Sequence, residues 1–213
     1  AIPVGALYLG ETPRTRFFDE ASADARLYRS LESAFAGDAI FITSSTQDGN
    51  KVLVETFSAS NPGDFFIYDQ KAKAAQHVVS RSSWIDPAQS AQVRAITVEA
   101  RDGVPLHGFL TSPHGQEAKN LPTVILPHGG PFNVFDDGTY DVEAQMLAAA
   151  GYAVLQLNFR GSGNYGRAFH QAGAQQWGLG MQDDLTDATR WAISEGIANK
   201  ARICIYGASY GAY

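Results

Sequence analysis

The sequence predicts a three-layer α/β fold with a mostly parallel sheet in its second half, preceded by antiparallel strands in its first half. Three observations indicate this class. Between residues 39 and 92 short strands follow one another without crossover helices, after residue 120 strands alternate with helices, and sixteen of the 21 glycines lie after residue 101. We therefore expect a first domain over residues 1–92 and a second domain over residues 93–213.

The first half is predicted to hold one helix and two hairpins. Leu27, Leu31 and Phe35 recur every four residues, as in a short amphipathic helix over 24–35. Strands are expected at 39–43 and Lys51–Phe57, joined through a tight turn in which Gly49 supplies the positive φ. A second pair of strands is expected at 65–68 and 76–79. Consecutive strands without a crossover helix indicate a meander or a propeller blade.

The second half is predicted to open with a hairpin and then to alternate strands with helices. The hairpin pairs 93–100 with 106–111 across a turn at 102–103, and a loop follows over 112–122. Strands are expected at 123–126, 152–158 and 202–206. Helices are expected at 142–150, ending at Gly151, and at 183–195. This alternation indicates a largely parallel sheet that an antiparallel hairpin opens.

Composition and charge exclude several classes of protein. The chain has 213 residues, of which 45% are apolar, so it can bury a sizeable core. Its net charge is −6 and its Lys and Arg residues are scattered, so we expect no nucleic-acid partner. The single cysteine, Cys204, excludes an internal disulfide framework and a multi-cysteine metal site. Because no apolar run reaches the ~18 residues of a membrane-spanning helix, no membrane partner is expected.

Both ends of the sequence predict that it is part of a longer chain. It starts at Ala1 without an initiator methionine or a recognisable signal peptide, and it stops at Tyr213, where a helix is expected to begin. The compartment therefore stays open between cytoplasm and periplasm or secretion. The oligomeric state stays open as well, a homo-oligomer included.

A Gly-x-Ser-x-Gly sequence directly follows the strand predicted at 202–206. Gly207 and Gly211 flank Ser209 and let the backbone turn sharply, so that the Ser209 hydroxyl stands exposed at the carboxyl end of the strand. In this geometry the Tyr210 N–H points to where an oxyanion would form. The pattern favours a nucleophile turn over an ordinary Gly-rich loop.

A second turn follows the strand predicted at 123–126 and reads His128-Gly129-Gly130-Pro131. Two successive glycines allow a backbone N–H to approach the same reacting centre, so we expect the Gly130 and Tyr210 N–H groups to form an oxyanion hole. Each such donor contributes on the order of 3 kcal/mol in acyl transfer. For His128 we expect a role in anchoring the turn through hydrogen bonds rather than a role as a base.

A third turn spans 158–166 and begins with Asn158 at the carboxyl end of the strand predicted at 152–158, where ligands bind in open α/β sheets. Its glycines do not have the spacing of a phosphate-binding loop. Arg160 is expected to be a structural cation, hydrogen-bonded to carbonyls or to a carboxylate such as Asp183, Asp184 or Asp187.

These turns, in this order, resemble the prolyl oligopeptidase family of serine peptidases, in particular its acylaminoacyl-peptidase and dipeptidyl-peptidase-like members. The first half resembles the last strands of the family's β-propeller. The resemblance covers nearly the whole chain, with weak motifs before residue 93. Its strongest motifs are 128–131, 158–166, Trp177-Gly178, Asp183-Asp184 with the helix up to Trp191, and 207–213.

The resemblance implies an α/β-hydrolase domain that hydrolyses short peptides through an acyl-enzyme on Ser209, without a metal or another cofactor. In this fold the catalytic Asp and His follow the nucleophile, whereas only four residues follow Ser209 here. All five histidines lie upstream: His77, His107, His114, His128 and His170. We therefore expect the 213-residue chain alone to be inactive. Ala212 stands where the family commonly has a second glycine, and we expect this difference to have little effect.

Two other functions stay open. The first is an esterase or lipase of the same fold, many of which carry a third glycine where this sequence has Pro131. That proline and the strand-rich first half favour the peptidase. The second is a fragment that only binds peptides or partner subunits through exposed sheet edges.

Overall fold

The computed structural model describes residues 3–8 and 13–213 and divides into two compact units. The first unit comprises Ala1–Gln89 and Thr139–Asp141, and the second comprises Ser90–Gly138 and Val142–Tyr213. The division falls three residues before the boundary expected after residue 92. The backbone of Ala91 explains the difference, because its N–H donates to Gln145 and its carbonyl accepts from the same side chain, at 2.8 and 3.2 Å.

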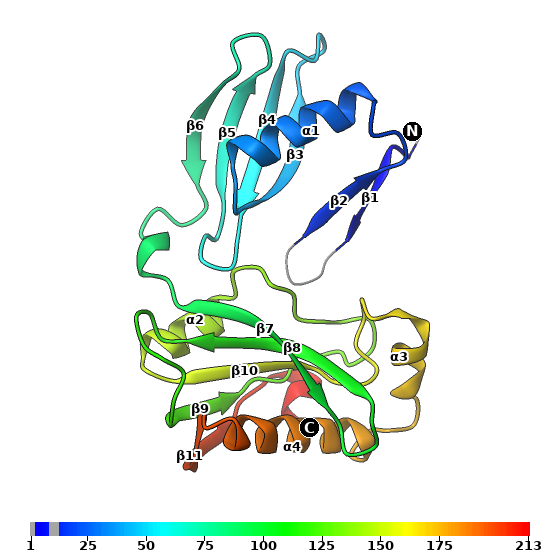
Figure 1. Ribbon diagram of the computed structural model, residues 1–213, viewed down its shortest axis with the longest axis vertical. Coiled ribbons are helices and arrows are strands. Elements are labelled where there is room, and N and C mark those ends of the chain that lie inside the picture. The colour runs from blue at the N-terminus through cyan, green and yellow to red at the C-terminus, as the bar shows by residue number, and fades with distance from the viewer. Residues whose placement is uncertain (1–2, 9–12) are drawn as a thin grey trace. The chain divides into compact units, whose positions relative to one another are not determined.

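The first unit is built on a four-stranded antiparallel meander (Figure 1). Its strands β3 (Ala39–Ser45), β4 (Lys51–Phe57), β5 (Asp64–Asp69) and β6 (Ala74–Ser80) pair in the order of the sequence, as predicted. Helix α1 (Ala23–Ala34) begins at its N-cap Ser22, whose hydroxyl accepts from the N–H of Ala25 at 3.1 Å. Leu31 of α1 packs against the strands in a core with Ile40, Val52, Val54 and Tyr68.

Two elements of the first unit were not predicted. They are the hairpin of β1 (Gly5–Tyr8) with β2 (Arg14–Phe17) and the short 3-10 helix η1 (Pro87–Gln89). The two strands have four residues each, and the sequence of β2, Arg-Thr-Arg-Phe, carries no apolar alternation. Their pairing therefore depends on the fold rather than on a local pattern.

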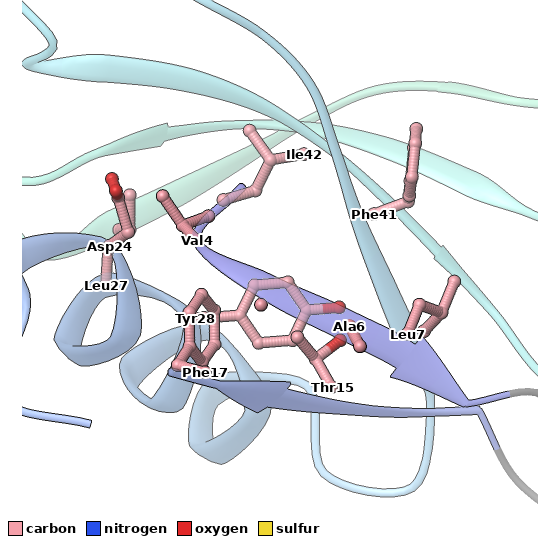
Figure 2. A pocket seen from close by; sticks show the side chains of 11 residues that line it. Val4, Ala6, Leu7, Thr15, Phe17, Asp24, Leu27, Tyr28, Phe41 and Ile42 are labelled. Atoms are coloured by element: carbon pink, nitrogen blue, oxygen red, sulfur yellow. The ribbon is translucent and has the colours of Figure 1, made fainter. Parts of the chain in front are cut away.

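A mostly apolar pocket of about 310 Å³ lies within the first unit, among β1, β2, α1 and β3. Figure 2 shows the Phe17, Tyr28 and Phe41 rings among its lining side chains. Among the described residues of the lining, Asp24 supplies the charged group. The hydroxyl of Tyr28 donates to the carbonyl of Ile40, so the pocket presents few groups for polar recognition.

The second unit contains a five-stranded mixed sheet with the order β11-β9-β10-β8-β7 (Figure 1). The hairpin of β7 (Gln92–Glu99) with β8 (Pro105–Ser112) supplies the antiparallel part, and β8 also pairs antiparallel with β10 (Ala153–Asn158). Strand β9 (Leu121–Ile125) pairs parallel with β10 and with β11 (Ala198–Ile205). The carboxyl ends of these three parallel strands therefore meet at one edge of the sheet, where the predicted turns begin.

Helices cover both faces of this sheet and make three layers. Val154 packs with Ala144 of α2 (Val142–Ala149), whereas Leu155 packs in a cluster with Ala188 of α4 (Gly180–Ser194). Successive side chains of a strand point to opposite faces, so α2 and α4 lie on opposite sides of the sheet. This confirms the predicted α/β fold. Gly151 follows α2 with φ +94°, as expected for the residue after a helix.

Some elements of the second unit differ from the sequence prediction. Helix α3 (Gly166–Ala172) was not predicted, because it is short and no side chain caps its start. Strand β11 begins four residues before the predicted start at 202, and its register shifts between Ala198 and Ile203, which hides its first part from an apolar pattern. Within the described residues, no helix combines the length and the apolar composition needed to cross a membrane.

Candidate active site

The turn after β11 has the backbone geometry expected of a strained nucleophile. Ser209 has φ +55°, a left-handed conformation that is unfavourable for a residue with a side chain. It begins the 3-10 turn η2 (Ser209–Ala212) and is exposed. A Cβ on Gly207 would lie 2.5 Å from the Gly211 carbonyl oxygen, and a Cβ on Gly211 would lie 2.2 Å from that of Pro127. Both flanking positions therefore need glycine because the backbone passes too closely for a side chain.

The second predicted turn lies directly against this one. A Cβ built on Gly129 would lie 3.5 Å from the Cβ of Ser209 and 3.9 Å from its Oγ. Gly130 follows with φ +112°, which also requires glycine, and Pro131 comes next. The structure thus brings together the two turns that the sequence placed at separate strand ends, although 80 residues separate Gly129 from Ser209.

His128 is fully engaged in holding its turn. Its Nδ1 lies 2.7 Å from the carbonyl oxygen of Gly129, and its Nε2 lies 2.8 Å from the Oγ of Ser162. The ring stacks on Phe159 with 4.4 Å between the centroids. Burial lowers the pKa of His128 below its ordinary value, so the ring is held neutral. The hydrogen bonds agree with the predicted anchoring role.

The third turn is anchored by buried polar groups. Asn158 is completely buried; its Oδ1 accepts from the N–H of Asp136 at 2.8 Å, and its Nδ2 donates to the carbonyl of Asp136 at 2.9 Å and to the hydroxyl of Tyr165 at 3.1 Å. These bonds fix the segment that follows the His128 turn. The side chain of Asn158 therefore stabilises the loop that follows the His128 turn.

Arg160 lies at the centre of an ion-pair network, as expected for a structural cation. Its guanidinium binds Asp184 with distances of 2.6 to 3.1 Å, and its backbone N–H donates to the same carboxylate at 2.9 Å. The guanidinium also contacts Asp102 at 2.7 and 3.1 Å. Asp184 was a predicted partner, whereas Asp102 was expected only to form a hairpin turn. Its 58-residue separation from Arg160 leaves no local signal.

The other two predicted partners of Arg160 bind a different arginine. Arg101 contacts Asp183 at 2.7 Å and Asp187 at 2.8 Å. The hydrogen bonds from Arg101 hold the pKa of Asp187 below its ordinary value. Burial raises the pKa of Asp184, although its contacts with Arg160 act in the opposite direction. The two arginines together tie the β7–β8 turn and the third turn to α4.

An aromatic cluster flanks the residue that follows Ser209. The ring of Tyr210 stacks on Tyr213 with 5.6 Å between centroids, and Trp177 lies 5.3 Å from Tyr210. The hydroxyl of Tyr210 reaches the sulfur of Met181 at 3.0 Å. These contacts hold Tyr210, the second predicted oxyanion donor, against the 177–181 segment. The sequence singled out Trp177 only as part of a motif.

Comparison with known proteins agrees with these features. The model of the prolyl oligopeptidase family matches residues 139–213. Dipeptidyl aminopeptidase BIII of Pseudoxanthomonas mexicana is 33% identical over 190 residues, which are 86% of this chain and 27% of that protein. Over residues 139–213 the chain matches the prolyl oligopeptidase family.

Solved structures of prolyl oligopeptidase family members show the same fold. A puromycin-hydrolyzing peptidase of Mycobacterium tuberculosis is 26% identical, with a TM-score of 0.64, and aligns with 76% of this chain and 26% of its own. The acylaminoacyl peptidase of Pyrococcus horikoshii is 19% identical, with a TM-score of 0.67, over 98% of this chain and 32% of its own. The chain spans about a quarter of the length of the relatives it matches.

Metal-ligating side chains do not cluster in the part of the chain that the structure describes. Within the ranges 3–8 and 13–213, no group of three or more His, Cys, Asp or Glu side chains could hold a metal ion. Cys204 is a free, exposed thiol on β11.

Proposed function

We propose that the protein containing this chain is a serine peptidase that cleaves short peptides through an acyl-enzyme on Ser209. The single observation that carries the proposal is the left-handed, exposed Ser209 with the Gly129-Gly130 turn against it. A serine that is strained, exposed and flanked by glycines at the end of a parallel strand is suited to attack a carbonyl carbon. The match of residues 139–213 to the prolyl oligopeptidase family and the similarity to a dipeptidyl aminopeptidase support the same reaction.

In the proposed reaction, Ser209 Oγ forms a bond to the carbonyl carbon of the scissile peptide and gives its proton to a general base. The N–H groups of Gly130 and Tyr210 stabilise the oxyanion of the tetrahedral intermediate. The carbon–nitrogen bond then breaks, and the amine leaves with the proton from the protonated base. Water then attacks the acyl carbon and gives a proton to the base, and the ester bond to Ser209 breaks as the serine oxygen takes that proton back.

A general base for Ser209 is not found among the described side chains. No side chain of residues 3–8 and 13–213 hydrogen-bonds to Ser209 Oγ, and both ring nitrogens of His128 have other partners. General-base catalysis contributes roughly 100- to 10,000-fold. We therefore infer that the 213-residue chain alone does not turn over substrate.

The proposed substrates are short peptides rather than esters. The related proteins named above are a dipeptidyl aminopeptidase, an acylaminoacyl peptidase and a puromycin-hydrolyzing peptidase, all of which are named for cleaving amide bonds. Pro131, which follows Gly130 at the oxyanion turn, also favours the peptidase over the esterase alternative.

The test is a comparison of two substrate classes with the natural protein that contains this sequence. We expect kcat/KM for aminoacyl or dipeptidyl anilides to match or exceed that for short-chain aryl esters, although esters are chemically easier to cleave. The 213-residue chain, assayed in parallel, is expected to cleave neither. Turnover of aryl esters without any hydrolysis of anilides would support the esterase instead.

A further inference from the structure

We propose that His128 is a positioning residue for the oxyanion donor: its imidazole holds the Gly129–Gly130 peptide so that the Gly130 N–H faces the reacting carbonyl, and Ser162 holds the imidazole. This inference deepens the proposed function and rests on it. It assigns a task to two polar side chains, the partly buried His128 and the fully buried Ser162.

The first step of the argument is the geometry of one peptide unit. The carbonyl oxygen of Gly129 lies 2.7 Å from His128 Nδ1 and belongs to the same planar unit as the N–H of Gly130. That unit is trans, so the N–H points away from the carbonyl oxygen. A bond that fixes the direction of the Gly129 carbonyl therefore fixes the direction of the Gly130 N–H.

The second step is that the two glycines do not hold this direction by themselves. Neither residue has a side chain, and Gly130 has φ +112°. Glycine populates many backbone conformations at little cost, so a Gly-Gly peptide can rotate more readily than others. A preorganised oxyanion donor requires an external hydrogen bond, and the His128 ring supplies it.

The third step is that the ring is itself fixed on two sides. A carbonyl only accepts hydrogen bonds, so Nδ1 of the neutral ring carries the proton and Nε2 is the acceptor. The Ser162 hydroxyl lies 2.8 Å from Nε2 and 2.7 Å from the carbonyl oxygen of Phe159, and it shares its one proton between them. Ser162 is completely buried, and the Phe159 ring stacks on the imidazole at 4.4 Å.

The fourth step connects this arrangement to a rigid element. Phe159 and Ser162 flank Arg160, whose backbone and guanidinium both bind Asp184 of α4. The third turn is thus tied to a helix and supports His128 through two of its residues. Three segments far apart in the sequence together determine where one N–H group points.

The test uses the variants His128→Ala and Ser162→Ala in the natural protein that contains this sequence. We expect His128→Ala to lower kcat and kcat/KM for an anilide substrate together, by on the order of 100-fold, with KM nearly unchanged, because the lost interaction acts in the transition state. Ser162→Ala leaves the bond to Gly129 in place and is expected to lower both by about tenfold.

A binding measurement separates positioning from folding. A peptide boronic acid, which forms a tetrahedral adduct on a serine, is expected to lose affinity in parallel with kcat/KM, whereas a reversible peptide product should bind as tightly as to wild type. His114→Gln is the matched control. His114 follows the carboxyl end of β8, and its Nδ1 also lies near a backbone carbonyl, that of Ser90 at 3.2 Å. Its constants should remain at wild-type values.

Two results would overturn the inference. If active-site titration shows fewer active molecules but a normal kcat for each of them, His128 is only structural. Normal boronate affinity in both variants has the same meaning. Failure of the proposed function gives a different result, because the Ser209→Ala variant would then hydrolyse the substrate at the wild-type rate.

Discussion

Replacing Ser209 with alanine is expected to lower kcat/KM for peptide anilides by a factor on the order of 10⁴ to 10⁶ in the natural protein that contains this sequence. The substitution removes the attacking oxygen, and removal of a catalytic serine costs about this much in other serine hydrolases. Because Ser209 is exposed and alanine has a similar backbone preference, we expect thermal stability to change little.

Ser194→Ala is a suitable control for this prediction. Ser194 is an exposed serine at the end of α4, and its hydroxyl donates to the carbonyl of Trp191 at 2.8 Å. We expect full activity in this variant. Retention of more than about a tenth of wild-type activity by Ser209→Ala would show that another residue is the nucleophile.

Replacing Asp184 with asparagine is expected to destabilise the second unit by about 3 kcal/mol, the lower limit for breaking a buried ion pair. Asp184 is fully buried and binds both the backbone and the guanidinium of Arg160, whose side chain is 10% exposed. Without that charge, Arg160 retains only Asp102, which is 47% exposed. A buried cation would then be poorly compensated.

The neighbouring Asp183 provides the matched control. It forms its ion pair with Arg101 at 2.7 Å, and both side chains are about half exposed to solvent, so Asp183→Asn should cost less than about 1 kcal/mol. Hydrogen exchange of the amides in α4 and in the third turn measures both effects locally. Equal exchange rates in the two variants would contradict the importance assigned to the buried pair.

Local patterns predicted most of the fold. The apolar periodicity of Leu27, Leu31 and Phe35 located α1, and the run Lys51–Phe57 coincides with β4. Such elements are visible because their side chains face one core at a regular spacing. The hairpin β1–β2 and the helix α3 were missed since they are short and lack that spacing.

In the candidate site, too, the local turns were predictable from the sequence and the long-range contacts were not. The turn around Ser209 was predictable because the glycines that permit it lie within two residues of the serine. Ser162 was missed as a partner of His128, and Asp102 as a partner of Arg160, because 34 and 58 residues separate them. Hydrogen bonds between distant turns leave no periodicity in the sequence; only the folded sheet brings them together.

Labelling with a fluorophosphonate, followed by peptide mapping, tests the central claim most directly. This reagent phosphonylates an activated serine with loss of fluoride and leaves ordinary serines unmodified, so it reports nucleophilicity without assuming a substrate. We predict one adduct in the natural protein that contains this sequence, on the peptide that carries Ser209, and none in Ser209→Ala. A folded protein that is not labelled, or an adduct that maps to any other residue, would contradict the account.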